Sequence, residues 1–169
     1  MDDRRRRRVL WAMPTGLYVI GSRSGDRRNL MTANLAVQVA TEPKLVAVAV
    51  DSNAVTCRLV REGRCFSLNM LAREDRALVR RFVKPVEAAS VRLDPDGAAI
   101  EMAGEAVEEH ETGAPVLGRA LAWLDCGLRD TLDLGSHHLF VGEVVAVDGP
   151  DEGVPEVLRM EDTRMNYGG

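Results

Sequence analysis

Residues 29–56, NLMTANLAVQVATEPKLVAVAVDSNAVT, predict two strands that lead into a helix. Polar and apolar residues alternate over residues 29–39, which is the pattern of a strand. A turn at Thr41-Glu42-Pro43 follows. Residues 45–50 then form a short apolar run rich in valine, typical of a strand buried on both faces or set in a barrel wall. This stretch therefore indicates two consecutive strands next to the start of a helix.

The apolar run stops at polar residues that often precede a helix. Asp51, Ser52 and Asn53 are preferred helix N-caps, and a helical pattern begins at residue 55. The first turn of a helix offers unpaired N–H groups and a positive dipole end, which together bind phosphate. We therefore expect Ser52, Asn53 and Thr56 to contact a phosphate. The alternative is that they only cap the helix.

Thr32 and Asn34 are expected on one side of the strand that precedes this turn. Backbone amides and short polar side chains can hydrogen-bond the polar edge of a flat heterocycle. The alternative is that both side chains face solvent on a half-exposed strand. The pattern alone leaves both interpretations open.

The composition is that of one soluble globular domain. The chain has 169 residues, of which 46% are hydrophobic and 28% charged. A net charge of −4 gives no indication of nucleic acid or of an anionic membrane as a partner. The sequence has no apolar run of membrane-spanning length and no signal-peptide core after its first residues, so a cytoplasmic location is expected.

Residues 1–13 contain a run of five arginines, residues 4–8, followed by apolar residues. We expect a short basic helix that ends before Pro14. Either it is a solvated helix or it is an arm that binds nucleic acid. The acidic balance of the chain favours the first.

The cysteines and histidines give no pattern typical of a metal site. Three cysteines are widely spaced and include no C-x-x-C pair, so buried free thiols are expected. Three histidines are too few and too unevenly placed to indicate a metal cluster.

The remaining pattern predicts a mainly antiparallel β domain. Strands are expected at residues 17–20, 64–71, 120–129 and 138–147, and helices at residues 55–62, stopped by Gly63, and 74–82. A turn at residues 24–26 makes the first two strands antiparallel neighbours. Residues 86–115 show no clear pattern, and residues 150–169 form a tail. Six or seven strands joined by short connections favour a barrel.

The motifs of two common enzyme classes are missing from the sequence. It contains neither the glycine fingerprint of a Rossmann unit nor a nucleophile elbow. The remaining candidates are Lys84, at the end of a cationic helix, and His137, in a Gly-Ser-His-His loop. A solvated lysine and an inert loop histidine are the alternatives.

The chain resembles the flavin reductase-like, FMN-binding split-barrel family, including its flavoredoxin-like subgroup. Each matching patch is weak alone, but together they follow the family order over most of the chain. They are residues 14–20, 29–34, 42–50, 63–71, 81–82, 122–126 and 135–144.

This resemblance implies a six-stranded antiparallel split β-barrel with flanking helices, forming a homodimer with flavin near the interface. The flavin ring is expected against Met31, Thr32, Ala33 and Asn34, largely through backbone groups. The phosphate or ribityl chain is expected at Ser52, Asn53 and Thr56. Phe82 and Lys84 are expected on the far side, His137 beside the nicotinamide, and Tyr167 over the flavin from the partner subunit.

The implied activity is hydride transfer from NADH or NADPH to FMN, with FAD as the alternative flavin and a monooxygenase as the partner that receives reduced flavin. The second hypothesis is an FMN-binding electron carrier without efficient NAD(P)H turnover. The chain departs from the family at Ser136, where an acid is common, and at Asn53, where a serine is common. No nucleic acid, membrane or metal is expected.

Overall fold

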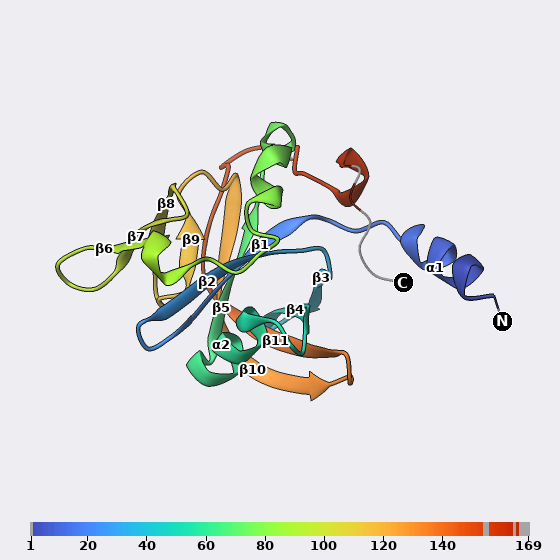
Figure 1. Cartoon of the computed structure of the whole chain (residues 1–169), viewed down its shortest axis with the longest axis horizontal. Helices are drawn as coiled ribbons and strands as arrows, with labels where there is room; N and C mark the ends of the chain where they lie inside the picture. Colours follow the sequence, from blue (N-terminus) through green and yellow to red (C-terminus); the bar gives the residue numbers. More distant parts are fainter. Residues whose placement is uncertain (1, 154–155, 164, 166–169) are drawn as a thin grey trace.

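In a computed structural model, which describes residues 2–153, 156–163 and 165, one seven-stranded antiparallel sheet forms the body of the protein (Figure 1). Its strands follow the order β2-β1-β5-β10-β11-β4-β3. Their bounds are β1 Tyr18–Ser24, β2 Arg27–Ala33, β3 Ala36–Thr41, β4 Lys44–Asp51, β5 Cys65–Met70, β10 Ala122–Asp133 and β11 His137–Asp148. The predicted mainly β, antiparallel fold is confirmed.

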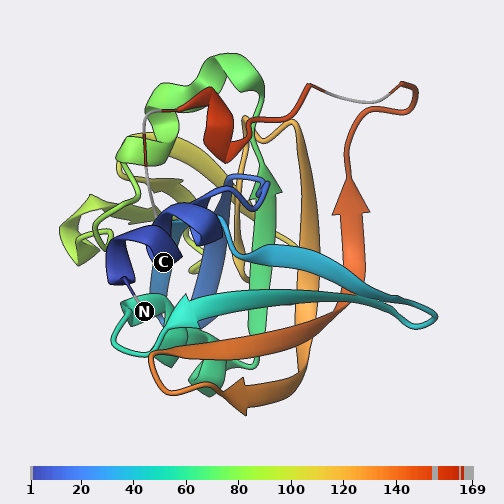
Figure 2. The same cartoon turned by 90° about the vertical axis from the view of Figure 1, so that its right-hand side faces the viewer.

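The sheet is rolled into a split barrel by its connections. β2 and β3 lie at opposite edges of the sheet, yet only Asn34 and Leu35 separate them along the chain. Two residues span about 7 Å at most, so the two edges must come close together. The N–H of Ala49 on β4 donates to the carbonyl of Leu35 across 2.9 Å. β10 and β11 are twelve residues each and bend around the barrel, with register shifts along their length (Figure 2).

The expected single strand at residues 29–39 is two strands. Alternation continues through Asn34 and Leu35, so the pattern does not show where one strand ends and the next begins. β2 has three buried residues in succession and packs inward, whereas β3 is an edge strand with Val37 and Val39 exposed. The main sheet therefore has seven strands.

The helix α2 (Val55–Gly63) forms where predicted, but both of its ends differ from expectation. Its N-cap is Ala54, without a side-chain cap, so Ser52 and Asn53 do not cap it. Its last residue is followed by Arg64 in the left-handed conformation, with φ 60°. Gly63 itself is needed for space, because a Cβ there would lie 1.7 Å from the carbonyl oxygen of Arg23.

The segment expected as an α-helix at residues 74–82 is the 3-10 segment η1 (Arg73–Arg80). Asp75 has non-helical φ/ψ and interrupts the turn. The buried residues are Leu78 and Val79, which are adjacent rather than one turn apart. Tertiary packing of these two side chains therefore overrides the local helical signal.

Residues 86–117, which are largely the stretch without a clear pattern, form a second, small antiparallel sheet beside the barrel (Figure 1). Its strands are β6 Val91–Leu93, β7 Ala99–Met102, β8 Glu105–Glu109 and β9 Pro115–Leu117, preceded by the 3-10 turn η2 (Ala88–Ser90). Arg28 on β2 forms a buried ion pair with Glu109 on β8, which fastens this sheet to the barrel.

Two apolar clusters fill the molecule. One includes Phe66, Cys126 and Phe140 within the barrel; the other includes Phe82 and Met102 between β1, β2, η1 and the small sheet. The three cysteines are buried and free, as expected.

The N-terminal helix α1 (Asp3–Trp11) extends from the barrel at the far end from the small sheet (Figure 1). None of its residues is buried. The tail returns along β1 and β5 through isolated bridges to Gly16 and Ala72, and ends in the 3-10 turn η3 (Met160–Asp162). Among the described residues, no helix is long and apolar enough to cross a membrane.

Candidate functional site

Asn29 connects three of the elements on which site residues were predicted. It lies on β2 with 2% of its surface exposed. Its side-chain amide donates to the Thr56 hydroxyl at the start of α2 across 2.9 Å, and its Oδ1 accepts from the N–H of Val86 across 2.8 Å. β2, the start of α2 and the connection that carries Lys84 are thereby held together. The sequence analysis did not select Asn29; its signal is an amide in a strand that is otherwise buried.

The turn between β4 and α2 is fastened to the loop between β10 and β11. The hydroxyl of Ser52 donates to the carbonyl of Gly135 across 2.7 Å, and the Ser52 N–H donates to the carbonyl of Ser136 across 2.9 Å. His137 pairs with Asp51 in the β11–β4 register. The residues predicted at the phosphate and the residue predicted at the nicotinamide are therefore neighbours.

Asn53 stands at the outer side of this turn. Its N–H donates to the Asp51 carboxylate across 2.8 Å, which shapes the turn, and its side chain is exposed. The first turn of α2 has no side-chain cap, so its N–H groups receive no hydrogen bond from a capping side chain.

Two adjacent histidines have different surroundings. His138 Nδ1 lies 3.1 Å from the Ser52 hydroxyl, and its ring stacks on Phe140 with centroids 6.0 Å apart. His137 is half-buried, with Nδ1 3.0 Å from the Ser136 hydroxyl. Its Nε2 is buried and has no hydrogen-bond partner. His138 thus supports the turn, while His137 keeps one ring nitrogen for a ligand.

The predicted ring-binding residues lie at the end of β2. Met31 and Thr32 are half-buried, and Ala33 is buried. The N–H of Thr32 donates to the carbonyl of Phe82 across 3.0 Å, and its hydroxyl donates to the carbonyl of Val79. The strand edge is therefore already partly covered by the end of η1 and the residues after it.

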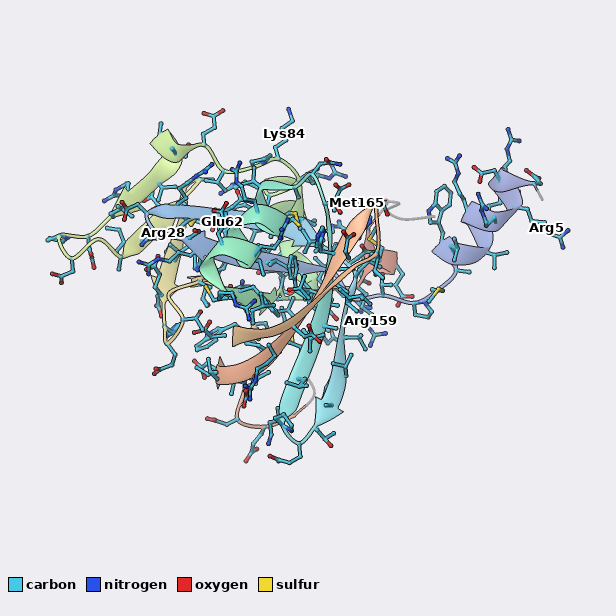
Figure 3. The ribbon with its side chains drawn as sticks, turned by 90° about the horizontal axis from the view of Figure 1, so that it is seen from below. Arg5, Arg28, Glu62, Lys84, Arg159 and Met165 are labelled. Atoms are coloured by element: carbon cyan, nitrogen blue, oxygen red, sulfur yellow. The ribbon has the colours of Figure 1, made fainter. Side chains whose placement is uncertain are left out.

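The other predicted residues divide between the interior and the surface. The side chains of Thr56 and Phe82 are fully buried, Thr56 against Asn29 and Phe82 in an apolar cluster. Lys84 is exposed and points away from the molecule (Figure 3). Tyr167 lies outside the described residues.

Asn34 lies on a pocket of about 810 Å³. The pocket is bounded by the end of α1, the start of β1, the corner between β2 and β3, and the tail, with Arg159 and Met165 on its wall (Figure 3). Asn34 is 5% exposed, and its Oδ1 is buried with no hydrogen-bond partner. A buried acceptor without a partner costs free energy, so this atom is suited to a ligand N–H.

Metal chemistry has no support in the described part of the chain. Within residues 2–153, 156–163 and 165, no three His, Cys, Asp or Glu side chains are grouped as metal ligands. The site offers instead backbone N–H groups, an unpaired amide oxygen and an imidazole nitrogen.

Comparison with known proteins identifies the family. Residues 10–168 match the model of the flavin reductase like domain. The high molecular weight rubredoxin of Moorella thermoacetica is 30% identical over 139 residues, covering 81% of this chain. The chain spans 57% of the length of that relative.

Two solved structures have the same fold. The NADH:FAD oxidoreductase SgcE6 of Streptomyces globisporus, in complex with NAD and FAD fragments, superposes with a TM-score of 0.77 at 25% identity, covering 99% of this chain and 93% of its own. BorF, the flavin reductase component of a bacterial two-component tryptophan halogenase, superposes with a TM-score of 0.69 at 27% identity, covering 89% of each chain. The family model spans nearly the whole chain, and these structures share its fold. The chain therefore belongs to the flavin reductase like domain family.

Proposed function

We propose that the protein is an NAD(P)H-dependent flavin reductase whose flavin lies along the end of β2, the β4–α2 turn and the loop before β11. One observation carries this proposal. Hydrogen bonds join Asn29 on β2 to Thr56 at the start of α2, and Ser52 in the β4–α2 turn to Gly135 in the loop before β11, which supports placing the three predicted segments in one site. These segments are far apart in the sequence, and their meeting is what a flavin site requires.

Polar groups on these segments and at the corner after β2 suit a flavin mononucleotide. The ring carries an N–H donor, and Asn34 Oδ1 is a buried acceptor without a partner. The uncapped first turn of α2 suits one phosphate, which Asn53 and Lys84 would also approach. FMN is therefore the proposed flavin. FAD is the alternative, supported by the name of SgcE6.

The flavin, when bound, supplies the redox chemistry by accepting a hydride from a reduced nicotinamide. The protein positions the flavin and the nicotinamide. We assign to His137 the orientation of the nicotinamide through Nε2, the nitrogen that has no partner. The Ser136 hydroxyl lies 3.0 Å from Nδ1 and can donate to it or accept from it, so it orients the ring.

We further propose a homodimer that delivers reduced flavin to a monooxygenase. The support is that BorF is named as the flavin reductase component of a two-component halogenase.

An electron-carrying flavoprotein is the second candidate. Ser136 stands where the family often has an acid, and this removes a charge beside His137. A high molecular weight rubredoxin among the relatives also favours a carrier. In that case flavin binds as proposed, but nicotinamide reduces it slowly.

Stopped-flow mixing without oxygen separates the two candidates. The FMN-loaded protein is mixed with NADH or NADPH, and flavin absorbance is followed. Bleaching at tens per second or faster is expected for the reductase, by analogy with ordinary enzyme turnover of about 1–1,000 per second. Bleaching over minutes with both nucleotides would favour the electron-carrying flavoprotein.

Two variants locate the site residues. His137→Ala is expected to slow reduction at least about tenfold, because a positioned hydrogen bond is lost. His110→Ala is the matched control, since His110 stacks on Trp123 away from this surface. Asn34→Ala is expected to weaken FMN binding about tenfold, measured by fluorescence quenching. An unchanged rate for the first variant removes His137 from the mechanism.

A further inference from the structure

The tail forms one wall of the pocket at Asn34, and it is bonded there to the segment before β1. The N–H of Met160 donates to the carbonyl of Thr15 across 3.2 Å. Next to this bond, Gly16 and Arg159 form an antiparallel bridge. The backbone of Arg159 is therefore fixed at this wall of the pocket.

The side chain of Arg159 faces the pocket because the side chain before it fills the core. Leu158 is 1% exposed and belongs to the apolar cluster that contains Phe82. Arg159 has an extended backbone, with φ −120° and ψ 161°, and successive side chains of an extended segment point to opposite sides. Arg159 accordingly lines the pocket, on the side of the barrel from which α1 extends (Figure 3).

Thr15 connects Arg159 to the unpaired acceptor of the pocket. Its hydroxyl oxygen lies 3.4 Å from Asn34 Nδ2, and the next residue, Gly16, is the bridge partner of Arg159. Asn34 Oδ1 is buried and has no hydrogen-bond partner. A ligand whose N–H binds this oxygen therefore shares the pocket with the guanidinium of Arg159.

Arg159 is the one cation and Glu161 the one anion among the described residues that line this pocket. Their guanidinium and carboxylate are 3.6 Å apart and the side chains are 60% and 66% exposed, so the ion pair is weak. Burial raises the pKa of Tyr18, so its phenol is neutral near pH 7 and adds no charge to the pocket. The guanidinium can therefore donate to an acceptor on a ligand.

We propose that Arg159 stabilises the negative charge that the flavin ring gains on reduction, and thereby raises the reduction potential of the bound flavin. This assignment rests on the proposed function, in which Asn34 Oδ1 accepts the N–H of the ring. That N–H stands between the two ring carbonyls. A hydride brings two electrons and one proton to the neutral ring, which becomes an anion with its charge shared between N1 and the adjacent carbonyl oxygen.

Arg159 and Glu161 should act on this charge in opposite directions. A fixed cation where charge develops favours the charged form of the ring over the neutral form, and arginine is protonated at every pH at which the protein is folded. The carboxylate of Glu161 in the same pocket favours the neutral form. Two neighbouring residues with opposite expected effects separate a local effect of charge from a general loss of structure.

The ratio of the dissociation constants of oxidised and reduced FMN tests the proposal in the full chain. Oxidised FMN is titrated by fluorescence and reduced FMN by absorbance without oxygen, and the midpoint potential of the bound flavin gives the same ratio independently. Arg159→Gln should weaken the binding of reduced FMN about tenfold more than that of oxidised FMN, which lowers the two-electron potential by about 30 mV. Glu161→Gln should change the ratio in the opposite direction, and Arg159→Lys should retain most of the wild-type ratio.

Arg92→Gln is the matched control, because Arg92 is also an exposed arginine paired with a glutamate, Glu101, but lies on the small sheet. It should leave the ratio unchanged. Riboflavin, which lacks the phosphate, should show the same change with Arg159→Gln as FMN does. A change with FMN alone would place Arg159 at the phosphate and overturn the proposal.

The failure of this proposal differs from the failure of the proposed function. If the wild type binds FMN and Arg159→Gln leaves the ratio unchanged, or weakens both redox states equally, the role assigned to Arg159 is wrong and the flavin site stands. If the wild type binds flavin in neither redox state, the proposed function is wrong, and the role of Arg159 is wrong with it.

Discussion

Position 63 requires glycine because there is no room for a side chain, and not because of its backbone conformation. From the sequence it was expected to stop α2, but the left-handed residue is Arg64. A Cβ at position 63 would lie 1.7 Å from the carbonyl oxygen of Arg23. A helix terminus can be predicted from the residues next to it in the sequence, whereas a contact with a residue forty positions earlier cannot.

Gly63→Ala is therefore expected to destabilise the protein by about 1–3 kcal/mol through overpacking. Gly127→Ala is the matched control, because the nearest atom to a Cβ there is 3.9 Å away. Urea unfolding of the two variants measures the difference. Equal stability of the two would show that β1 moves away from α2 at no cost.

The contribution of Cys126 to the stability of the fold depends on pH. Burial raises the pKa of its thiol from the ordinary 9.0 to about 12, and the neighbouring Asp125 adds to this shift. The folded state therefore favours the protonated thiol. Its contribution to stability is complete below pH 9 and is lost as the pH rises toward 12.

The measurement is the difference in unfolding free energy between the wild type and Cys126→Ala at pH 8, 9.5 and 10.5. This difference should shrink by at most about 1.4 kcal/mol for each pH unit above 9. Burial also raises the pKa values of Cys57 and Cys65, but these thiols are present in both proteins and cancel. A constant difference would mean that the thiolate forms as readily in the fold as in the unfolded chain.

At the scale of elements, the strands were predictable where their apolar residues form a clear pattern. A continuous apolar run indicated β4, alternation indicated β5, and regularly placed apolar residues indicated β11. The break at Asn34, the 3-10 geometry of η1 and the small sheet were not. Each depends on contacts with segments distant in sequence, such as the bonds from Thr32 to Val79 and Phe82.

The small sheet depends on a charge pair that the sequence does not reveal. The side chains of Arg28 and Glu109 are 1% and 6% exposed, and Glu109 also accepts from the N–H of Ala99 across 3.2 Å. Glu109→Gln leaves the Arg28 charge buried without a counter-charge. We expect a loss of about 3 kcal/mol or more in urea unfolding.

Glu101→Gln provides the control for this variant. Its partner Arg92 is 64% exposed, so the pair should contribute no more than about 1 kcal/mol. If Glu109→Gln cost as little as Glu101→Gln, Arg28 would be held by its bonds to the carbonyls of Asp26 and Gly97 alone.

At the scale of the whole molecule, the candidate site is a consequence of rolling the sheet. The residues that meet there come from β2, the start of α2 and the loop before β11. Ser52 and His137 were selected from the sequence by their chemical type and Asn29 was not, whereas the meeting of their segments required the barrel. The burial of Thr56 and Phe82 was not predictable from the sequence. Both were expected to contact the flavin, but their side chains are enclosed by the protein.

The barrel and the small sheet should unfold together, because buried polar bonds join them as well as apolar packing. The hydroxyl of Ser67 on β5 donates to the carbonyl of Pro115 across 2.6 Å, and the N–H of Leu117 donates to Asn69 Oδ1 across 2.8 Å. Separating the sheets would leave these groups unpaired, at about 1–3 kcal/mol each. A partly unfolded state is therefore expected to be unpopulated.

Two probes in one urea titration test this cooperativity. Trp123 reports on β10 once Trp11 is replaced by Phe, and far-UV circular dichroism reports on all strands. Their midpoints should coincide, and FMN at 100 times its dissociation constant should move both by the same amount, about 2.7 kcal/mol. A circular dichroism change that precedes the fluorescence change would show that the small sheet detaches first. The proposed flavin site would then depend on the barrel and α2, to which the bonds from Asn29 to Thr56 and from Ser52 to Gly135 belong.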